Sequence, residues 1–140
     1  MDTEQDDLVD ALVRAAFATM ASLSRIGAEN DLSLSQLRVF GILRDRRLRM
    51  TELADYLGLE KSTMSGLIDR AEKRGLVTRA PNATDRRAVD VFLSPEGLAV
   101  AQLIRARVAA ALAPMTSRLS PAEQHRLQAL LERTLSEPPQ

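Results

Sequence analysis

Basic and small hydroxyl side chains gather between residues 61 and 87, where they could contact a polyanion. Lys61 opens one stretch, serines and a threonine follow it directly, and Arg70 lies further along. Arg86 and Arg87 stand side by side in a second stretch. Guanidinium groups pair with guanine and with phosphate, and serine and threonine hydroxyls bond base edges or phosphates. We therefore expect this part of the chain to bind nucleic acid.

The first stretch is predicted to be one face of a helix over residues 61–74. Met64, Leu67, Ile68 and Ala71 recur at helical spacing and form the stripe that should be buried. The opposite face carries Lys61, Ser62, Ser65, Gly66, Asp69, Arg70 and Lys73, with Thr63 at its edge. Its small residues would let another surface come close, and the N-terminal part of such a helix is the part that enters a major groove.

A shorter helix is predicted to precede it. Thr51 should cap a helix from Glu52 to Leu57, and Gly58 should end it because glycine adopts the left-handed backbone conformation at low cost. A short helix, a tight turn, a second helix and a strand pair follow one another in a winged helix-turn-helix.

The strand pair is predicted over residues 76–80 and 88–93, which makes 76–93 the wing. The loop between the strands contains turn-forming residues and then the two adjacent arginines. It is either a solvated hairpin tip in which Asp85 pairs locally, or a wing from which an arginine reaches a minor groove. We favour the second interpretation, because the negative potential of the minor groove attracts guanidinium.

Net charge is zero, but the charges are unevenly distributed. Residues 44–87 hold eleven Lys and Arg against seven acids, residues 1–43 hold three against seven, and residues 88–140 hold five of each. The basic surplus coincides with the predicted helix-turn-helix and wing, where phosphates would lie. The arginine-rich run at residues 44–49 is either a solvated loop or a further phosphate contact.

Long apolar helices are predicted on both sides of this unit. Residues 5–29 form the first, a helix after residue 94 ends or kinks at Pro114, and a final helix follows. Serine N-caps, two of them in capping boxes, mark three helix starts: Ser33, Ser94 and Ser120. The terminal helices carry more apolar surface than one small domain can cover, so we expect a second copy of the chain to bury it.

At this point the chain resembles the multiple antibiotic resistance regulator (MarR) family. The resemblance is carried by three segments of the helix-turn-helix and by the wing with the residues after it: 53–59, 61–65, 69–77 and 85–97. The sequence Asp-Arg-Arg-Ala in the wing, followed by a strand and then Ser-Pro-Glu-Gly, is the most specific of these. Helix order and length match the family from about residue 5 to residue 136.

The resemblance implies a homodimer bound to a pseudo-palindromic operator in double-stranded DNA. It implies that Ser62, Thr63, Ser65 and Gly66 face bases or phosphates, and that Arg86 reaches the minor groove. Asp85 and Arg87 would brace the wing or bind phosphate, and Arg70 is a further phosphate candidate. The residues assigned to DNA are therefore Lys61, Ser62, Thr63, Ser65, Gly66, Arg70, Asp85, Arg86 and Arg87.

One of these positions departs from the family pattern. Members often carry arginine or another long side chain where this sequence has Gly66. Glycine within a helix costs roughly 1 kcal/mol relative to alanine. Either the backbone approaches DNA closely at this position, or glycine fits a crowded contact.

Members of the family are commonly released from DNA by small phenolic or lipophilic molecules. The resemblance places such an effector pocket near Phe17, Met20, Leu37 and Phe40, with Arg38 as a partner for an anion. Each of these side chains could equally be ordinary core. Peroxide sensing through cysteine, which one branch of the family uses, is excluded because the chain has no cysteine.

Other functional classes find little support. The single histidine, His125, has no nucleophile beside it in sequence, and no phosphate-binding glycine loop or metal-ligand cluster occurs, so we expect no enzyme, cofactor or metal site. The acidic N-terminus is not a targeting peptide, and we expect no membrane-spanning segment and a cytoplasmic location. The main alternative is a winged-helix protein-interaction module that no longer reads DNA, which should have lost Arg86 and Arg87.

The sequence thus predicts a mainly α-helical chain with a small β-hairpin wing. Residues 33–93 form a winged helix-turn-helix, and residues 1–32 and 94–140 form a helical dimerisation region. The predicted function is a homodimeric, sequence-specific transcriptional regulator, with a repressor favoured over an activator.

Overall fold

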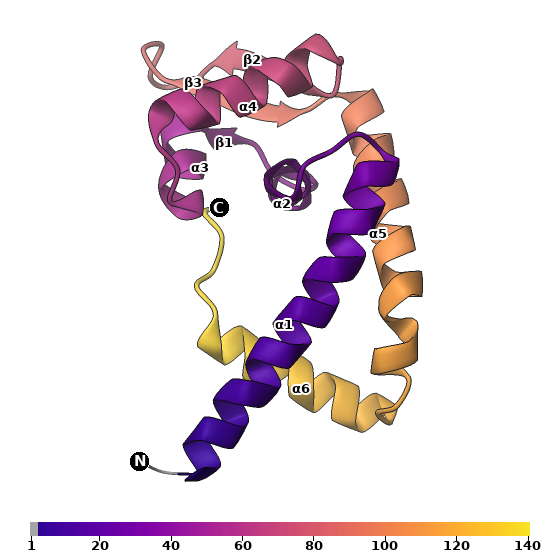
Figure 1. Ribbon diagram of the computed structural model, residues 1–140. Helices are drawn as coiled ribbons and strands as arrows, with labels where there is room; N and C mark the ends of the chain where they lie inside the picture. Colours follow the sequence, from indigo (N-terminus) through magenta and orange to yellow (C-terminus); the bar gives the residue numbers. More distant parts are fainter. Residues whose placement is uncertain (1–2) are drawn as a thin grey trace.

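The computed structural model describes residues 3–140 and contains six helices and three strands in that range. Figure 1 shows a lobe built from the middle of the chain, from which two long helices extend to a sixth helix at the far end. In chain order the elements are α1 (Thr3–Glu29), α2 (Leu34–Leu43), β1 (Leu48–Arg49), α3 (Met50–Leu57), α4 (Lys61–Lys73), β2 (Val77–Pro81), β3 (Val89–Leu93), α5 (Pro95–Thr116) and α6 (Pro121–Thr134). The predicted fold class is confirmed.

A continuous apolar core fills the lobe. It is built from α2, α3, α4 and the small sheet, and helices α1 and α5 add residues where they leave the lobe. Its largest fully buried side chains are Phe40, Leu48, Leu53, Met64, Ile68, Val39 and Val91. The interior therefore fixes how α3 and α4 are oriented relative to the sheet.

The sheet has three antiparallel strands in the order β1-β3-β2. The hairpin of β2 and β3 follows the sequence prediction to within one residue at each end. The strand β1 was not predicted, because two residues are too short to show any alternation. It pairs Leu48 with Val91 and Arg49 with Asp90, which makes β3 the central strand.

Most of the predicted helix boundaries are confirmed. Ser33 and Ser120 form capping boxes with Gln36 and Glu123, and the backbone N–H of each serine donates to the side chain three residues on at 2.9 Å. Gly58 ends α3 with φ of 67°, a left-handed conformation that glycine adopts without strain.

One expected helix start is wrong, and one of the two alternatives for a helix end is excluded. Thr51 is not a cap: α3 begins at Met50, because the Glu52 carboxylate accepts a hydrogen bond from the Arg49 N–H at 3.1 Å and so fixes an earlier start. Pro114 does not end α5, which continues to Thr116. A proline this close to a helix end removes one backbone hydrogen bond and leaves the last turn intact.

Helix α5 also departs from the expectation about membrane spans. By length and hydropathy it is long and apolar enough to cross a bilayer, because its many alanines count as apolar. Core helices of soluble proteins pass the same test. Here α5 carries two arginines, Arg105 and Arg107, and packs against α1 and α2 through Ala101 and Ile104.

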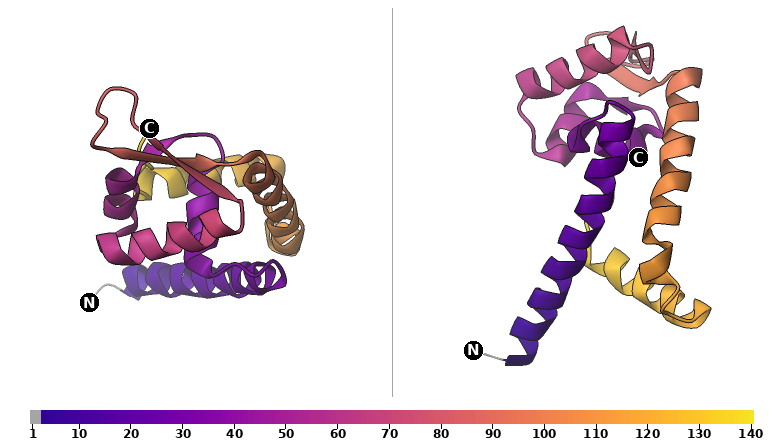
Figure 2. Two further views of the ribbon diagram at one scale, coloured as in Figure 1. Left: turned by 90° about the horizontal axis from the view of Figure 1, so that it is seen from above. Right: turned by 45° about the vertical axis from the view of Figure 1, so that its right-hand side comes forward.

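Away from the lobe, a large apolar surface lies uncovered within this chain. Figures 1 and 2 show α1 and α5 extending beyond the lobe, and α6 turning back from the far end of α5. No residue of α6 is buried, and in α1 only Ile26 and Gly27 are. The exposed apolar residues of this region include Leu8, Val9, Leu12, Val13, Phe17, Met20, Leu127, Leu130, Leu131 and Leu135.

Candidate nucleic-acid interface

Helix α4 presents the face that the sequence predicted. Met64, Leu67, Ile68 and Ala71 are all buried, so the opposite side is turned out of the lobe. Of the residues assigned to DNA on this helix, four are exposed and two are half-buried: Lys61, Ser62, Thr63 and Arg70, then Ser65 and Gly66. The first turn is preceded by Glu60, which makes no side-chain cap.

The two arginines of the wing loop, Arg86 and Arg87, differ in their contacts. Asp85 accepts a hydrogen bond from the Arg87 N–H at 3.1 Å, and its carboxylate lies 3.6 Å from the Arg87 guanidinium, whose side chain is 95% exposed. The local pairing expected for Asp85 is thus present. Arg86 is exposed, and its side chain makes no hydrogen bond or ion pair within residues 3–140. It is therefore free to bind a ligand outside the lobe.

A groove of about 280 Å³ separates the start of α4 from the wing. It is lined by Met50, Thr51, Ala54, Lys61, Ser65, Arg79, Arg87, Ala88 and Val89. Three of these residues are cationic and none is acidic. Helix α4 and the wing therefore form two walls of one basic groove, and α3 contributes a third.

Arg79, on β2, lines this groove and was not among the residues that the sequence assigned to DNA. Its guanidinium donates to the Asp69 carboxylate and, at 3.3 Å, to the Ser65 carbonyl oxygen, and it lies 3.8 Å from the Glu72 carboxylate. It ties the wing to α4 and pairs with the acids that α4 carries. Period-two alternation showed Arg79 only as an outward strand residue, since its partners lie 7 to 14 positions earlier in the chain.

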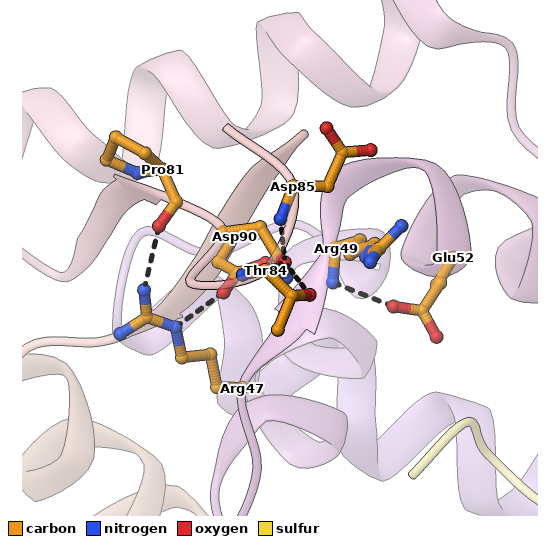
Figure 3. Close-up of polar contacts among 8 residues, drawn as sticks. Arg47, Arg49, Glu52, Pro81, Thr84, Asp85 and Asp90 are labelled. Atoms are coloured by element: carbon orange, nitrogen blue, oxygen red, sulfur yellow. Dashed lines mark hydrogen bonds and ion pairs between the residues drawn. The ribbon is translucent and has the colours of Figure 1, made fainter. Parts of the chain in front are cut away.

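The arginine-rich run at residues 44–49 is largely occupied by contacts within the protein. Arg46 donates to the carbonyl oxygen of Pro139 at 2.8 Å, and Arg47 donates to the Asp90 carboxylate at 2.7 Å. Figure 3 shows Arg47 reaching both Asp90 and the carbonyl oxygen of Pro81 at the base of the wing. Arg47 thus has a structural role, and the last two residues of the run form β1.

The five residues assigned to an effector pocket do not all meet within one chain. Leu37 and Phe40 line a cleft of about 380 Å³ between α1, α2 and α5. Phe17 and Met20 are exposed further along α1 and do not line it. Arg38 faces a different cleft, where its guanidinium lies 5.5 Å from the centre of the Tyr56 ring. Helix α2 is the cause, since residues 37 and 38 point to different sides.

The cleft between α1, α2 and α5 has charged residues that the sequence did not suggest. Besides Leu23, Ala101, Ile104 and Val108, its lining includes Arg44 and Arg105. It combines an apolar wall with two cations. No cluster of three metal-ligating side chains occurs among residues 3–140.

Comparison with known proteins finds a family model that matches the middle of the chain. The model of the MarR family matches residues 30–88, which span the helix-turn-helix and the wing loop. Residues 30–88 of the chain thus resemble the MarR family. Its members are transcriptional regulators, which is the class that the sequence predicted.

Relatives and solved structures agree with this membership. The HTH-type transcriptional regulator YfiV of Bacillus subtilis is 37% identical over 65 residues, 46% of this chain and 41% of YfiV. The homoprotocatechuate degradative operon repressor of Escherichia coli is 26% identical over 128 residues, 91% of this chain and 86% of the repressor. The chain thus spans less than half of YfiV and most of the second relative.

Two solved structures resemble this chain over most of its length. A mutant MarR from Escherichia coli, in complex with operator DNA, is 24% identical with a TM-score of 0.72, covering 97% of this chain and 100% of that one, and it shows a shared fold. NadR in complex with 4-hydroxyphenylacetate is 25% identical with a TM-score of 0.77, covering 89% of each chain.

Proposed function

We propose that this protein is a homodimeric repressor that binds a pseudo-palindromic operator in double-stranded DNA. The observation that supports this most is the groove between α4 and the wing, with three cations and no acid in its lining. The free guanidinium of Arg86 lies beside it on the wing. A protein-interaction module would not need this arrangement, so DNA binding is the better account.

Each element has its own part in the proposed complex. The start of α4 enters the major groove, with Lys61, Ser62, Thr63, Ser65 and Gly66 towards bases or phosphates. Arg70 and Arg87 bind phosphates, and Asp85 braces the wing. Arg86 enters the flanking minor groove, where the potential is most negative.

The homodimer would form through residues 1–32 and 94–140. The uncovered leucines and valines of α1 and α6, with Phe17 at 65% exposure, are the surface that a second copy would bury. Two copies related by a two-fold axis would present two recognition helices to two half-sites, so the operator should be pseudo-palindromic. We infer a cytoplasmic regulator without enzymatic activity, cofactor or membrane contact.

The test is a binding titration on the DNA upstream of the protein's own gene, at two salt concentrations with random DNA as competitor. Replacing Arg86 and Arg87 by Ala should weaken operator binding about 100-fold and make the salt dependence shallower, because phosphate and minor-groove contacts are lost. Replacing Arg107 and Arg118 on and beside α5 removes the same charge far from the groove and should change binding less than about threefold. Equal losses in both variants would contradict the proposed interface.

We further propose that the cleft between α1, α2 and α5 binds a small phenolic or lipophilic acid that releases DNA. Its apolar wall suits an aromatic ring, and Arg44 and Arg105 suit a carboxylate. We expect 4-hydroxyphenylacetate to dissociate the operator complex and 4-hydroxyphenylethanol, which lacks the carboxylate, to do so at about tenfold higher concentration. Arg105→Gln should remove the difference between the two compounds, whereas Arg107→Gln should preserve it.

A further inference from the structure

The shape of the wing depends on one asparagine at its base. The Asn82 Oδ1 accepts hydrogen bonds from the Thr84 N–H at 3.0 Å, the Thr84 hydroxyl at 2.9 Å and the Asp85 N–H at 3.0 Å. The Asn82 N–H donates to the Ala88 carbonyl oxygen at 2.9 Å and closes the loop. This side chain therefore folds the segment that leads directly into Arg86.

Asn82 is in turn held by a carboxylate of the central strand. Its Nδ2 donates to Asp90 Oδ1 at 2.9 Å, and the Arg47 Nε donates to Asp90 Oδ2 at 2.7 Å. Asp90 is only 6% exposed. The donors on Asn82 and Arg47 hold the pKa of Asp90 below its usual value, although burial acts in the opposite direction.

Arg47 is itself fixed from two further sides. Its guanidinium lies 4.5 Å from the centre of the Phe92 ring and donates to the Pro81 carbonyl oxygen at 3.4 Å. Figure 3 shows Arg47, in the loop before β1, reaching towards the wing, with Asp90 between them and Thr84 and Asp85 beyond. Hydrogen bonds thus run without a break from Arg47 before β1 to the backbone next to Arg86.

We infer that Arg47, Asp90 and Asn82 are a positioning network that sets the direction of the wing and so places Arg86 in the minor groove. This inference rests on the proposed DNA binding. Asp90 is buried and its charge is paired, so neither Asp90 nor Asn82 needs to touch DNA. Their effect is to reduce the conformational freedom that the loop would otherwise lose on binding.

The network can be tested by exchanging its hydrogen-bond partners. In Asn82→Asp the donor to Asp90 is replaced by a second carboxylate, and in Asp90→Asn the charge that holds Arg47 is lost. Each change should weaken operator binding about tenfold, the effect of losing a buried charge-assisted hydrogen bond. The double variant Asn82→Asp with Asp90→Asn restores one donor facing one acceptor and the wild-type net charge. It should bind the operator more tightly than either single variant, because the pair between positions 82 and 90 is restored while Arg47 still faces a neutral side chain.

The same changes in an Arg86→Ala background separate positioning from stability. If the network acts by placing Arg86, Asn82→Asp should then cost less than about twofold, because the contact that it positions is already missing. A loss due to added negative charge or to partial unfolding would persist in that background. Ser33→Ala, which removes the capping box of α2 outside the wing, controls for general destabilisation, and thermal unfolding is measured on every variant.

The outcomes distinguish this inference from the proposed function. Three results together support the network. The wild-type protein binds the operator through Arg86, each single variant binds it more weakly, and the double variant recovers affinity. Two results would overturn the network but not the proposed function. In the first, operator binding depends on Arg86 but Asn82→Asp does not change it. In the second, Asn82→Asp weakens operator binding equally with and without Arg86. Wild-type protein that binds operator and random DNA equally overturns the proposed function and the network together.

Discussion

At the scale of single residues, two arginines of the wing have opposite environments. Arg79 is tied to Ser65 and Asp69, and its side chain is 27% exposed. Arg86 is exposed in the wing loop and has no hydrogen bond or ion pair to the rest of the described chain. The first arginine stabilises the arrangement of wing and helix, and the second is available to a ligand. Residue type alone does not distinguish these roles.

No contact within the chain explains the glycine at position 66. A Cβ added there would meet only the end of the Arg70 side chain, at 3.5 Å, so no crowded contact within the chain requires glycine. The other explanation given by the sequence, close approach of the backbone to DNA, becomes the hypothesis to test.

Gly66→Ala should raise the free energy of unfolding by about 1 kcal/mol, because alanine is the better helix former, and it should weaken operator binding while leaving binding to random DNA unchanged. Chemical denaturation and the DNA titration measure the two effects. Gly41→Ala is the matched control, since a Cβ there meets nothing within 4 Å and the site lies on α2. If Gly66→Ala made the protein more stable and also tightened operator binding, close approach of the backbone to DNA would be contradicted.

At the scale of elements, the start of α5 joins the lobe to the long helices. The Ser94 hydroxyl donates to the Gly75 carbonyl oxygen at 2.6 Å and accepts from the Gly97 N–H at 3.0 Å. The Ser94 N–H donates to the Leu76 carbonyl oxygen at 3.1 Å. The Ser-Pro-Glu-Gly segment that carried much of the family resemblance is therefore a rigid junction between α4, β2 and α5.

Gly97→Ala should destabilise the protein by about 2 kcal/mol or more, because overpacking against fixed backbone forces a shift of the chain. The new Cβ would lie 1.9 Å from the Leu76 carbonyl oxygen. Urea denaturation gives the change in unfolding free energy, with Gly66→Ala as the control that should change it in the opposite direction. A stable Gly97→Ala protein would mean that α5 packs less closely on the lobe than described.

At the scale of the whole molecule, the lobe is complete within one chain and the helical region is not. The core of the lobe excludes water from Leu53, Met64 and Ile68 almost completely. In contrast, α6 buries no residue of its own, and the first two-thirds of α1 is exposed along its apolar face. An apolar surface of this extent marks an interaction site.

Replacing Leu12 and Leu131 together by Glu should convert the dimer to a monomer, because charge at the centre of an apolar interface costs several kcal/mol. Analytical ultracentrifugation measures the mass, and operator affinity should fall about 100-fold, since each monomer reaches one half-site only. Leu34→Glu places the same charge on an exposed leucine of α2 and should leave the dimer intact. A wild-type monomer at micromolar concentration would refute the dimer.

The sequence by itself determined the local elements of this protein. Serine caps, Gly58 and the stripe from Met64 to Ala71 depend on neighbours within a few residues, so period and cap chemistry were enough to locate the helices and the outward face of α4. The arginine pair in the wing and the family pattern were equally visible, since they lie within short continuous segments.

Only the tertiary structure decided how distant residues combine. The strand β1, the bonds of Arg79 to α4, the network from Arg47 through Asp90 to Asn82, and the separation of Arg38 from Leu37 and Phe40 depend on positions 7 to 43 residues apart or on opposite sides of one helix. Hydrogen bonds between such positions leave no periodic signal in the sequence, because they require only that folding brings a donor and an acceptor together.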